Sequence, residues 1–547
     1  MSWLSPPDLT TLRIALGLAV PSLYLLAALA AFGQSTSVGW RWAGRSATTA
    51  ALVALVSLLA WAVGGDLVFR GQAVLPLGDT GAVTSSVRSD LVGSVVLLLV
   101  TFIGWVIVRY SRTYLAGEPR QERYVRALLA TLASVCIVVV TNNLAVLALA
   151  WLGTSLALHR LLTFYGDRPQ ALVAAHKKFL ASRLGDVCLL TAIGLVGHAV
   201  GSLDIDVAVA RAAALPGPTA GLQAAAILFA FSALLKCAQL PIHGWLIQVM
   251  EAPTPVSALL HAGVVNLGGF LLIRVGSLVA DVAAAQTLLV VVGSVTAVVA
   301  ALVMTTRISV KVMLAWSTCA QMGFMLMQCG LGAYGLALLH LVAHSLYKAY
   351  AFLAAGGAVE QARLRQMTPP DQPIPLAASV GGAVGGLVIV TAAGWLWGVH
   401  PVDSPGLWAL ATIVCLALAP LLSAQALRIG GLWPAALIVG AFAVAVAYFG
   451  LHEVLGQRLD GGASASVPSP GPIAWVLFVF VLLFIVQSLI RAKPHGRVAR
   501  TLYPWFYGGL YLDELFTRLT FRIWPARLSQ PSGFHRSTRA PATSGVA

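Results

Sequence analysis

Four charged residues lie inside long apolar stretches of this chain, where an ionised group is costly. Arg183 and Asp186 share one stretch, Lys236 lies in a second and Lys348 in a third. A charge at the centre of a bilayer costs about 3 kcal/mol on insertion scales, so such residues are retained mainly where an ion must pass. The chemistry that they offer is reversible protonation, because a desolvated lysine gives up its proton more readily than a lysine in water.

Arg183 and Asp186 are three residues apart, a spacing that puts both side chains on one face of a helix within ion-pair reach. This spacing leaves two interpretations open. In the first, the pair is a structural salt bridge that neutralises two buried charges. In the second, Asp186 tunes the charge of a lysine on a neighbouring helix.

Lys236 precedes a predicted helix break. Pro241 follows it, lacks an amide hydrogen and clashes with the preceding turn, so we expect the helix to break one turn after the lysine. Broken helices at membrane depth occur where they line a wet cavity. Pro253 and Pro255 indicate a second helix break. A lone helix histidine is more often a packed core residue, but the position of His261 just after these prolines makes it a candidate for the ion pathway.

His340, His344 and Lys348 are spaced by four residues, which places all three on one stripe of a helix. Histidine exchanges a proton near neutral pH, so the stripe predicts a relay. A metal site is the competing interpretation, but it needs a third ligand that the pattern does not supply. We therefore predict no metal and no cofactor in this chain. Because nucleotide-binding and redox motifs are also missing, the energy should come from an ion gradient or a partner subunit.

The elements that must position these residues are transmembrane helices. Of 547 residues, 59% are hydrophobic and 10% are charged, whereas a soluble domain carries about 25% charge. The sequence predicts an all-α polytopic membrane protein with about 15 spans. We place them near residues 12–32, 48–64, 90–108, 127–140, 144–164, 179–197, 221–247, 256–273, 285–304, 312–331, 334–358, 374–397, 406–424, 432–450 and 473–490.

The net charge of +15 follows from the loops and does not indicate a nucleic-acid partner. With these spans, 25 Lys and Arg lie on the side of the C-terminus and 6 on the opposite side. Basic loops stay in the cytoplasm, so we predict an external N-terminus and a cytoplasmic C-terminus in the cell inner membrane. Arg183, Lys236 and Lys348 are then the basic residues left inside spans, whereas Lys177 and Lys178 belong to a cytoplasmic loop.

Several motifs between about residues 100 and 360 resemble the signature of the antiporter-like, proton-conducting membrane subunits of respiratory complex I, Mrp cation/proton antiporters and related hydrogenases. These motifs are Arg183-Leu-Gly-Asp186, Lys236-Cys-Ala-Gln-Leu-Pro-Ile-His-Gly-Trp-Leu, Glu251-Ala-Pro-Thr-Pro-Val-Ser-Ala-Leu-Leu-His261, Ala315-Trp-Ser-Thr-Cys-Ala-Gln-Met-Gly323 and His340-Leu-Val-Ala-His344-Ser-Leu-Tyr-Lys348. The resemblance implies two inverted five-helix repeats, each with a broken helix. It also implies that Lys236 and Lys348 lie on a proton path along the membrane midplane.

Two departures from the family pattern concern this path. The family has a Trp-Glu-Gly motif on the helix before the Arg/Asp helix, but the matching positions here are Trp151-Leu152-Gly153. The lysine or acid of the later broken helix also has no match between residues 374 and 398.

We divide the chain into N-terminal transmembrane helices (1–125), an antiporter-like conducting core (126–373), C-terminal transmembrane helices (374–490) and a cytoplasmic amphipathic tail (491–547). The tail is short, aromatic and suited to a membrane surface or a partner. It is similar to the tail of membrane subunits of inorganic carbon accumulation systems. That resemblance implies a large cytoplasmic partner that contains zinc and resembles a β-carbonic anhydrase.

The functional expectation is a non-enzymatic subunit that conducts protons or sodium ions and thereby energises carbon dioxide or bicarbonate uptake by the partner. The alternative is a subunit of a complex I-like or Mrp-type cation/proton antiporter complex. A third possibility is a membrane scaffold that conducts nothing, because Leu152 replaces the family acid.

Overall fold

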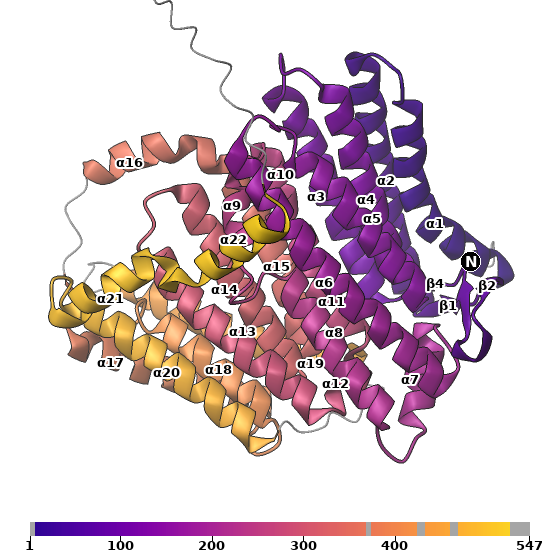
Figure 1. The fold of residues 1–547 in the computed structure, drawn as a ribbon. Helices are drawn as coiled ribbons and strands as arrows, with labels where there is room; N and C mark the ends of the chain where they lie inside the picture. The colour runs from indigo at the N-terminus through magenta and orange to yellow at the C-terminus, as the bar shows by residue number, and fades with distance from the viewer. Residues whose placement is uncertain (1–5, 368–372, 424–432, 460–468, 526–547) are drawn as a thin grey trace, which may run out of the picture.

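The computed structural model describes residues 6–367, 373–423, 433–459 and 469–525 (Figure 1). The α-helices are α1 (Pro6–Ala30), α2 (Thr36–Gly64), α3 (Leu91–Tyr114), α4 (Gln121–Val140), α5 (Leu144–Leu162), α6 (Pro169–Val200), α7 (Ile205–Ala213), α8 (Ala220–Lys236), α9 (Gly244–Gln248), α10 (Thr254–Ala262), α11 (Leu267–Arg274), α12 (Gly276–Ala280), α13 (Ala283–Met304), α14 (Val310–Gly330), α15 (Tyr334–Leu353), α16 (Ala358–Gln366), α17 (Leu376–Leu396), α18 (Pro405–Leu418), α19 (Trp433–Leu459), α20 (Pro470–Ala492), α21 (Arg497–Tyr507) and α22 (Leu512–Ile523). Short 3-10 helices include η3 (Val264–Asn266) and η6 (Gly509–Tyr511).

Thirteen helices in the described part of the chain are long and apolar enough to cross a membrane. Two shorter apolar helices, α8 and α18, occupy the places of two further predicted spans. The predicted fold class, a polytopic α-helical membrane protein, is confirmed. The count of 15 spans, the repeats and the domain boundaries stay predictions.

Four short strands lie between α2 and α3 and were not predicted. Strands β1 (Leu67–Phe69) and β4 (Val87–Ser89) pair antiparallel, as do β2 (Ala73–Pro76) and β3 (Ala82–Thr84). They are too short to disturb the apolar pattern from which the spans were derived.

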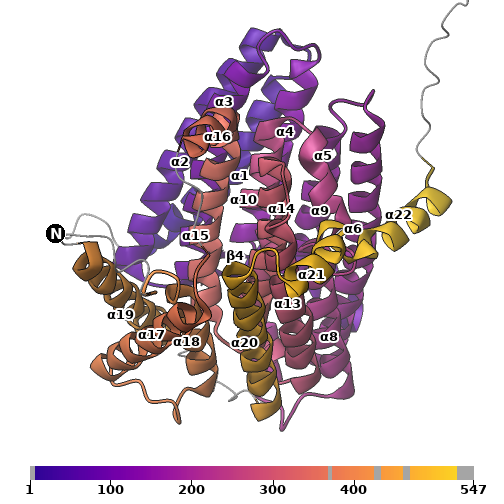
Figure 2. The ribbon, with the colours of Figure 1, turned by 90° about the vertical axis from the view of Figure 1, so that its left-hand side faces the viewer.

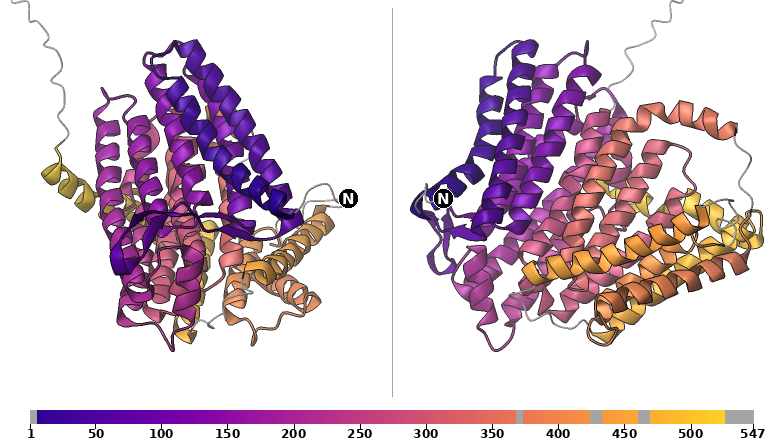
Figure 3. Two further views of the ribbon diagram at one scale, coloured as in Figure 1. Left: turned by 90° about the vertical axis from the view of Figure 1, so that its right-hand side faces the viewer. Right: turned by 180° about the vertical axis from the view of Figure 1, so that it is seen from behind.

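Two apolar cores hold the helices together. The larger one extends from α1 to α15, and the second joins α13 and α14 to α17, α18, α19 and α20. Figure 2 shows α17, α18 and α19 on one side of the bundle, with α20 beside α13. In the right view of Figure 3 the N-terminal helices lie on the opposite side of the bundle from α17–α20. The helices that carry the candidate residues contact helices of both groups, such as α3 and α19.

Glycines allow α13 and α14 to pack closely. A Cβ added to Gly293 would lie 2.6 Å from the carbonyl oxygen of Gly323, and a Cβ on Gly323 would lie 2.5 Å from that of Gly293. Small residues at such crossings let transmembrane helices approach until their backbones touch. This contact fixes α14 beside the helix break described below.

Contacts between loops define two faces of the molecule. On the first, which we call the tail face, Tyr165 bonds Glu118, Lys311 bonds Thr254, and the C-terminal helices α21 and α22 cross the bundle (Figure 1). On the second, which we call the hairpin face, the strands pack beside the α6–α7 loop. There Arg274, at the end of α11, pairs with Asp90, which caps α3.

Candidate ion pathway

The predicted helix break after Lys236 is present, although its position differs from the prediction. Helix α8 ends at Lys236 itself, not one turn later, and the chain resumes as α9 at Gly244. Ala238 adopts a left-handed conformation (φ 53°) that ends the helix before Pro241 is reached. The irregular segment is held in place by α13, because the Leu240 amide donates to the Thr296 hydroxyl at 3.2 Å.

Pro253 and Pro255 stand at an interruption between helical segments, where η2 (Val249–Glu251) ends and α10 begins. Pro253 caps α10 and Pro255 lies in its first turn. Proline is tolerated there because the first amides of a helix have no intrahelical partner. A further interruption comes after His261, where α10 ends at Ala262 and gives way to η3 and α11. Sequence analysis missed this break, and Asn266 within an apolar run was the available signal.

Lys236, Asp186 and Arg183 form one buried cluster. The Lys236 ammonium pairs with one oxygen of Asp186, and the Arg183 guanidinium lies 2.7 Å from the other. The Lys236 ammonium also lies 4.2 Å from the centre of the Trp151 ring. The side chain of Lys236 is only 5% exposed. Asp186 is therefore shared between two cations on two helices, which is the geometry that the second interpretation of the Arg183/Asp186 spacing required.

Lys177 and Lys178 were assigned to a loop, and the structure corrects this. Helix α6 begins at Pro169, ten residues before the predicted span, and both lysines are buried in its first half. The Lys178 ammonium donates to the hydroxyl and the carbonyl of Ser155 at 2.7 and 3.0 Å. Because these residues are charged, the predicted span begins ten residues after the actual start of the helix.

A small cavity adjoins both Lys178 and Lys236. Ser182 and Trp245 also line it. The space in it that is open to the centre of a water molecule is about 20 Å³. That is enough for one water. The Trp245 indole N–H is buried and has no hydrogen-bond partner among the described residues. Buried polar groups normally bond to protein or water, so a water here would accept from this indole N–H.

The predicted stripe on α15 forms a second cluster. His344 Nε2 lies 3.3 Å from the carbonyl oxygen of His261, and the His340 and His344 rings are 5.9 Å apart. The Lys348 ammonium donates to the Leu314 carbonyl at 3.0 Å and to the Ser317 hydroxyl. No carboxylate lies within ion-pair distance of Lys348 in the part of the chain that the structure describes.

The interrupted helix α10–η3–α11 stands between the two clusters. Its Leu260, Val264 and Val265 line the cavity beside Lys236, whereas its His261 stacks on Phe352 with ring centroids 4.4 Å apart. Both ring nitrogens of His261 are buried without a hydrogen-bond partner among the described residues. This segment therefore contributes to both clusters.

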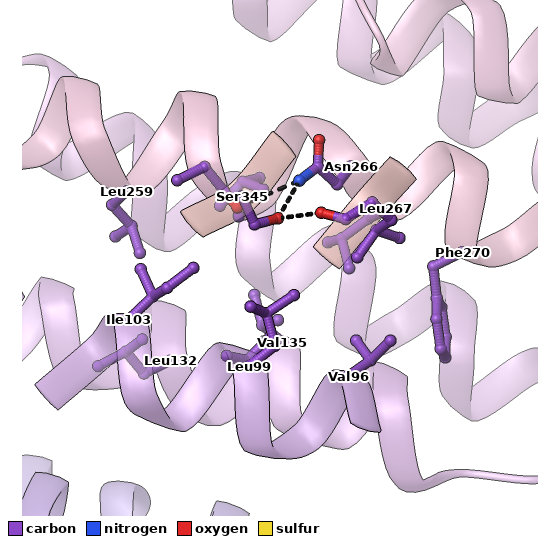
Figure 4. Close-up of a pocket in the computed structure, with 15 residues that line it drawn as sticks. Val96, Leu99, Ile103, Leu132, Val135, Leu259, Asn266, Leu267, Phe270 and Ser345 are labelled. Carbon is purple, nitrogen blue, oxygen red and sulfur yellow. Dashed lines mark hydrogen bonds between the residues drawn. The ribbon is translucent and has the colours of Figure 1, made fainter. Parts of the chain in front are cut away.

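A hydrogen bond holds the interruption between α10 and α11 against α15. The Asn266 amide donates to the Ser345 hydroxyl at 2.7 Å, as Figure 4 shows. Below this contact lies an apolar pocket lined by residues of α3, α4 and α11, among them Ile103, Val135 and Phe270. An apolar cavity stays dry. This pocket therefore offers no water through which an ion could pass.

Comparison with known proteins agrees with this architecture. Residues 141–370 match the family described as NADH:quinone oxidoreductase/Mrp antiporter, and residues 77–125 match the N-terminus of complex I chain 5. The structure of an Mrp complex from Dietzia sp. DQ12-45-1b is similar, with a TM-score of 0.61 at 25% identity over 94% of this chain and 59% of the Mrp chain. The fold and the matched residues are those of an antiporter-like membrane subunit.

Sequence relatives define the family more closely. The probable inorganic carbon transporter subunit DabB of Hydrogenovibrio crunogenus is 44% identical, over 79% of this chain and 82% of the relative. DabB2 of Halothiobacillus neapolitanus is 37% identical over 97% of both chains. Subunit L of the NADH-quinone oxidoreductase of Mycobacterium tuberculosis is 34% identical, but only over 64% of this chain and 55% of the relative. The chain therefore belongs to the DabB family of multi-pass, antiporter-like membrane subunits.

Proposed function

We propose that this chain conducts protons through the membrane and that their flow energises inorganic carbon uptake by a cytoplasmic partner. The observation that carries the proposal is the buried Lys236–Asp186 pair at a helix break, beside a cavity with room for water. The names of the DabB relatives support the carbon half of the proposal. Sodium ions are the alternative cargo.

The geometry suggests how a proton moves. While Lys236 contacts Asp186 its charge is stabilised, and Arg183 stabilises the same carboxylate from the other side. If the Lys236 ammonium turns from Asp186 toward the cavity, its proton can pass to a water, and Lys178 lines the same cavity. Arg183 stays paired with the Asp186 carboxylate, whose negative charge attracts the next proton to Lys236.

The second cluster continues the path. Lys348 is held by a hydroxyl and a carbonyl oxygen, so only neutral dipoles stabilise its charge. His261, His340 and His344 offer ring nitrogens between which a proton can pass through water. In this scheme the proton moves along the membrane from the Lys236 cluster, past the interruption of α10, to the α15 stripe.

The partner that we propose is the large cytoplasmic subunit of DabA type, with zinc and a β-carbonic-anhydrase-like fold. One charge that moves across 100 mV releases about 2.3 kcal/mol. Because about 1.4 kcal/mol corresponds to a tenfold change in an equilibrium constant, one proton shifts the carbon dioxide/bicarbonate balance about 50-fold. This chain would supply that energy, and the chemistry would reside in the partner.

The test is proton flux in proteoliposomes that contain the chain purified with its partner. Lys236→Ala should abolish the flux, whereas the control Lys493→Ala, at an exposed lysine just after α20, should not change it. Unchanged flux in Lys236→Ala, or no flux in the unmodified complex, would contradict the proposal. The second outcome would favour a membrane scaffold.

The second candidate is a subunit of a respiratory or Mrp-type complex. It is favoured by the similarity to the Mrp complex structure and to the complex I subunits. Purification from native membranes in mild detergent distinguishes the two. One large zinc-bearing partner would support carbon uptake, whereas several hydrophobic antiporter-like subunits would support the second candidate.

A further inference from the structure

The C-terminal helices α21 and α22 form a strap across the tail face, and a kink separates them. Gly509, Leu510 and Tyr511 have positive φ angles of 62°, 56° and 57°. This conformation is costly for the two residues that are not glycine, so the surrounding contacts must hold it. Figures 1 and 2 show the two helices running in succession past α14 and α6. The first turn of α22, just after the kink, lies over the N-terminal half of α6.

Asp513 in that first turn binds a buried lysine. Both of its carboxylate oxygens lie 2.9 Å from the Lys177 ammonium, and Gln248 at the end of α9 donates to one of them at 3.0 Å. The Lys177 side chain is fully buried, whereas that of Asp513 is 31% exposed. A Cβ added to Gly244 would overlap the carboxylate. Lys177, Gln248 and Gly244, which lie outside the strap, therefore form a binding site for the Asp513 carboxylate, which also reaches solvent. We call this binding site the seat.

The strap is fixed on both sides of this seat. Before it, Arg307 donates to the carbonyl of Phe506 at 3.1 Å. After it, Trp524 stacks on His176, with ring centroids 3.9 Å apart and planes 10° apart. These contacts hold the carboxylate against α6 and α9 independently of the ion pair.

The seat lies on the two elements that carry the candidate path. Lys177 precedes Lys178, which lines the cavity beside Lys236, and Gln248 lies on α9, just after the helix break. Lys177 and Asp186 are nine residues apart on α6, which is about 13 Å along the helix. Asp513 therefore stands between solvent on the tail face and the Lys236 cluster.

We propose that Asp513 is the group through which the ion path exchanges protons with solvent at the tail face, and that Lys177, Gln248 and Gly244 position it. The proposal rests on the proposed proton conduction. In the exchange step a proton from a water in the path bonds to a carboxylate oxygen of Asp513. It then leaves to a water of bulk solvent, which restores the carboxylate. Flow in the opposite direction reverses these two transfers.

Asp513→Asn tests this assignment in the reconstituted complex, because the amide retains the shape of the carboxylate but cannot carry the proton. We expect a loss of proton flux of at least tenfold, with hydrogen exchange of residues 497–524 unchanged and flux partly restored by Asp513→Glu. Glu514→Gln is the matched control, since Glu514 neighbours Asp513 but pairs with the exposed Arg518. It should leave the flux unchanged.

Two results would overturn the assignment. Flux within twofold of the unmodified complex in Asp513→Asn, while Lys236→Ala abolishes it, would leave the proposed function intact but remove Asp513 from the path. Loss of both flux and hydrogen-exchange protection in Asp513→Asn, without restoration by Asp513→Glu, would assign Asp513 a purely structural role. If the unmodified complex conducts no protons, the proposed function and this assignment both fail.

Discussion

The two ion pairs of Asp186 predict that two single substitutions differ in their effect on stability. Asp186→Asn removes the carboxylate that pairs with Lys236 and leaves a 5% exposed ammonium without an acid among the described residues. Breaking a buried pair in this way costs about 3–5 kcal/mol. Lys236→Met leaves Asp186 paired with Arg183 at 2.7 Å. Methionine also fills much of the lysine volume, so its cost should stay below about 1.5 kcal/mol.

The expected difference between the two variants is thus at least about 1.5 kcal/mol, although both should abolish proton flux. The double variant should regain most of the stability lost in Asp186→Asn, because no unpaired ammonium remains, but none of the flux. Thermal unfolding in detergent with a thiol-reactive dye is a suitable assay. The cysteines are all free and, except for Cys188, buried, so the dye reports their exposure on unfolding.

Equal stability of Asp186→Asn and Lys236→Met would refute this reasoning, since it would show that the charge of Lys236 does not depend on Asp186. A double variant as unstable as Asp186→Asn would refute it as well. The destabilisation would then come from the loss of Asp186 itself and not from an unpaired lysine.

Three further predictions concern other parts of the molecule. Lys178→Met should lower proton flux at least about a hundredfold in proteoliposomes, the usual scale for a lost proton-transfer group. Gly293→Val should push α13 from α14 and cost about 1–3 kcal/mol of unfolding free energy in the dye assay, because even its Cβ would lie 2.6 Å from a backbone oxygen. On the hairpin face, burial alone would raise the pKa of Asp206, but hydrogen bonds, chiefly from Arg70, hold that pKa below its ordinary value. The ionised Asp206 carboxylate should therefore stabilise the folded state above about pH 4, and this stabilisation should be lost as the pH falls further. Arg70→Ala should weaken this pH dependence of the unfolding free energy, measured from pH 3 to 6.

The sequence was most informative where local rules govern the structure. Arg183 and Asp186 are three residues apart on one helix, so helical geometry alone brings them together. Pro241 correctly predicted a break near Lys236, although the helix already ends at Lys236, before the proline is reached. The resemblance to antiporter-like subunits identified the same residues, and comparison with known proteins confirmed that family.

The sequence was least informative where a contact joins distant segments. Lys177 and Lys178 were placed in a loop because charges at the start of an apolar run are usually solvated. Their burial depends on partners that the run does not contain. The partner of Lys178 is Ser155 on the preceding helix, and that of Lys177 is Asp513, 336 residues later. No local pattern predicts such pairs, so only the assembled structure reveals them.

The balance of charge along α6 gives the strap a role beyond anchoring. Four cations, Lys177, Lys178, Arg183 and Lys236, lie on α6 or at the end of α8, and their described carboxylate partners are Asp186 and Asp513. Without the strap, Asp186 would be the one carboxylate among the described residues that pairs with any of these cations. Buried like charges repel strongly, so α6 with its lysines charged requires a second acid. In this structure that acid is Asp513 of the strap. It places a negative charge at the tail face, where a proton would enter or leave the path.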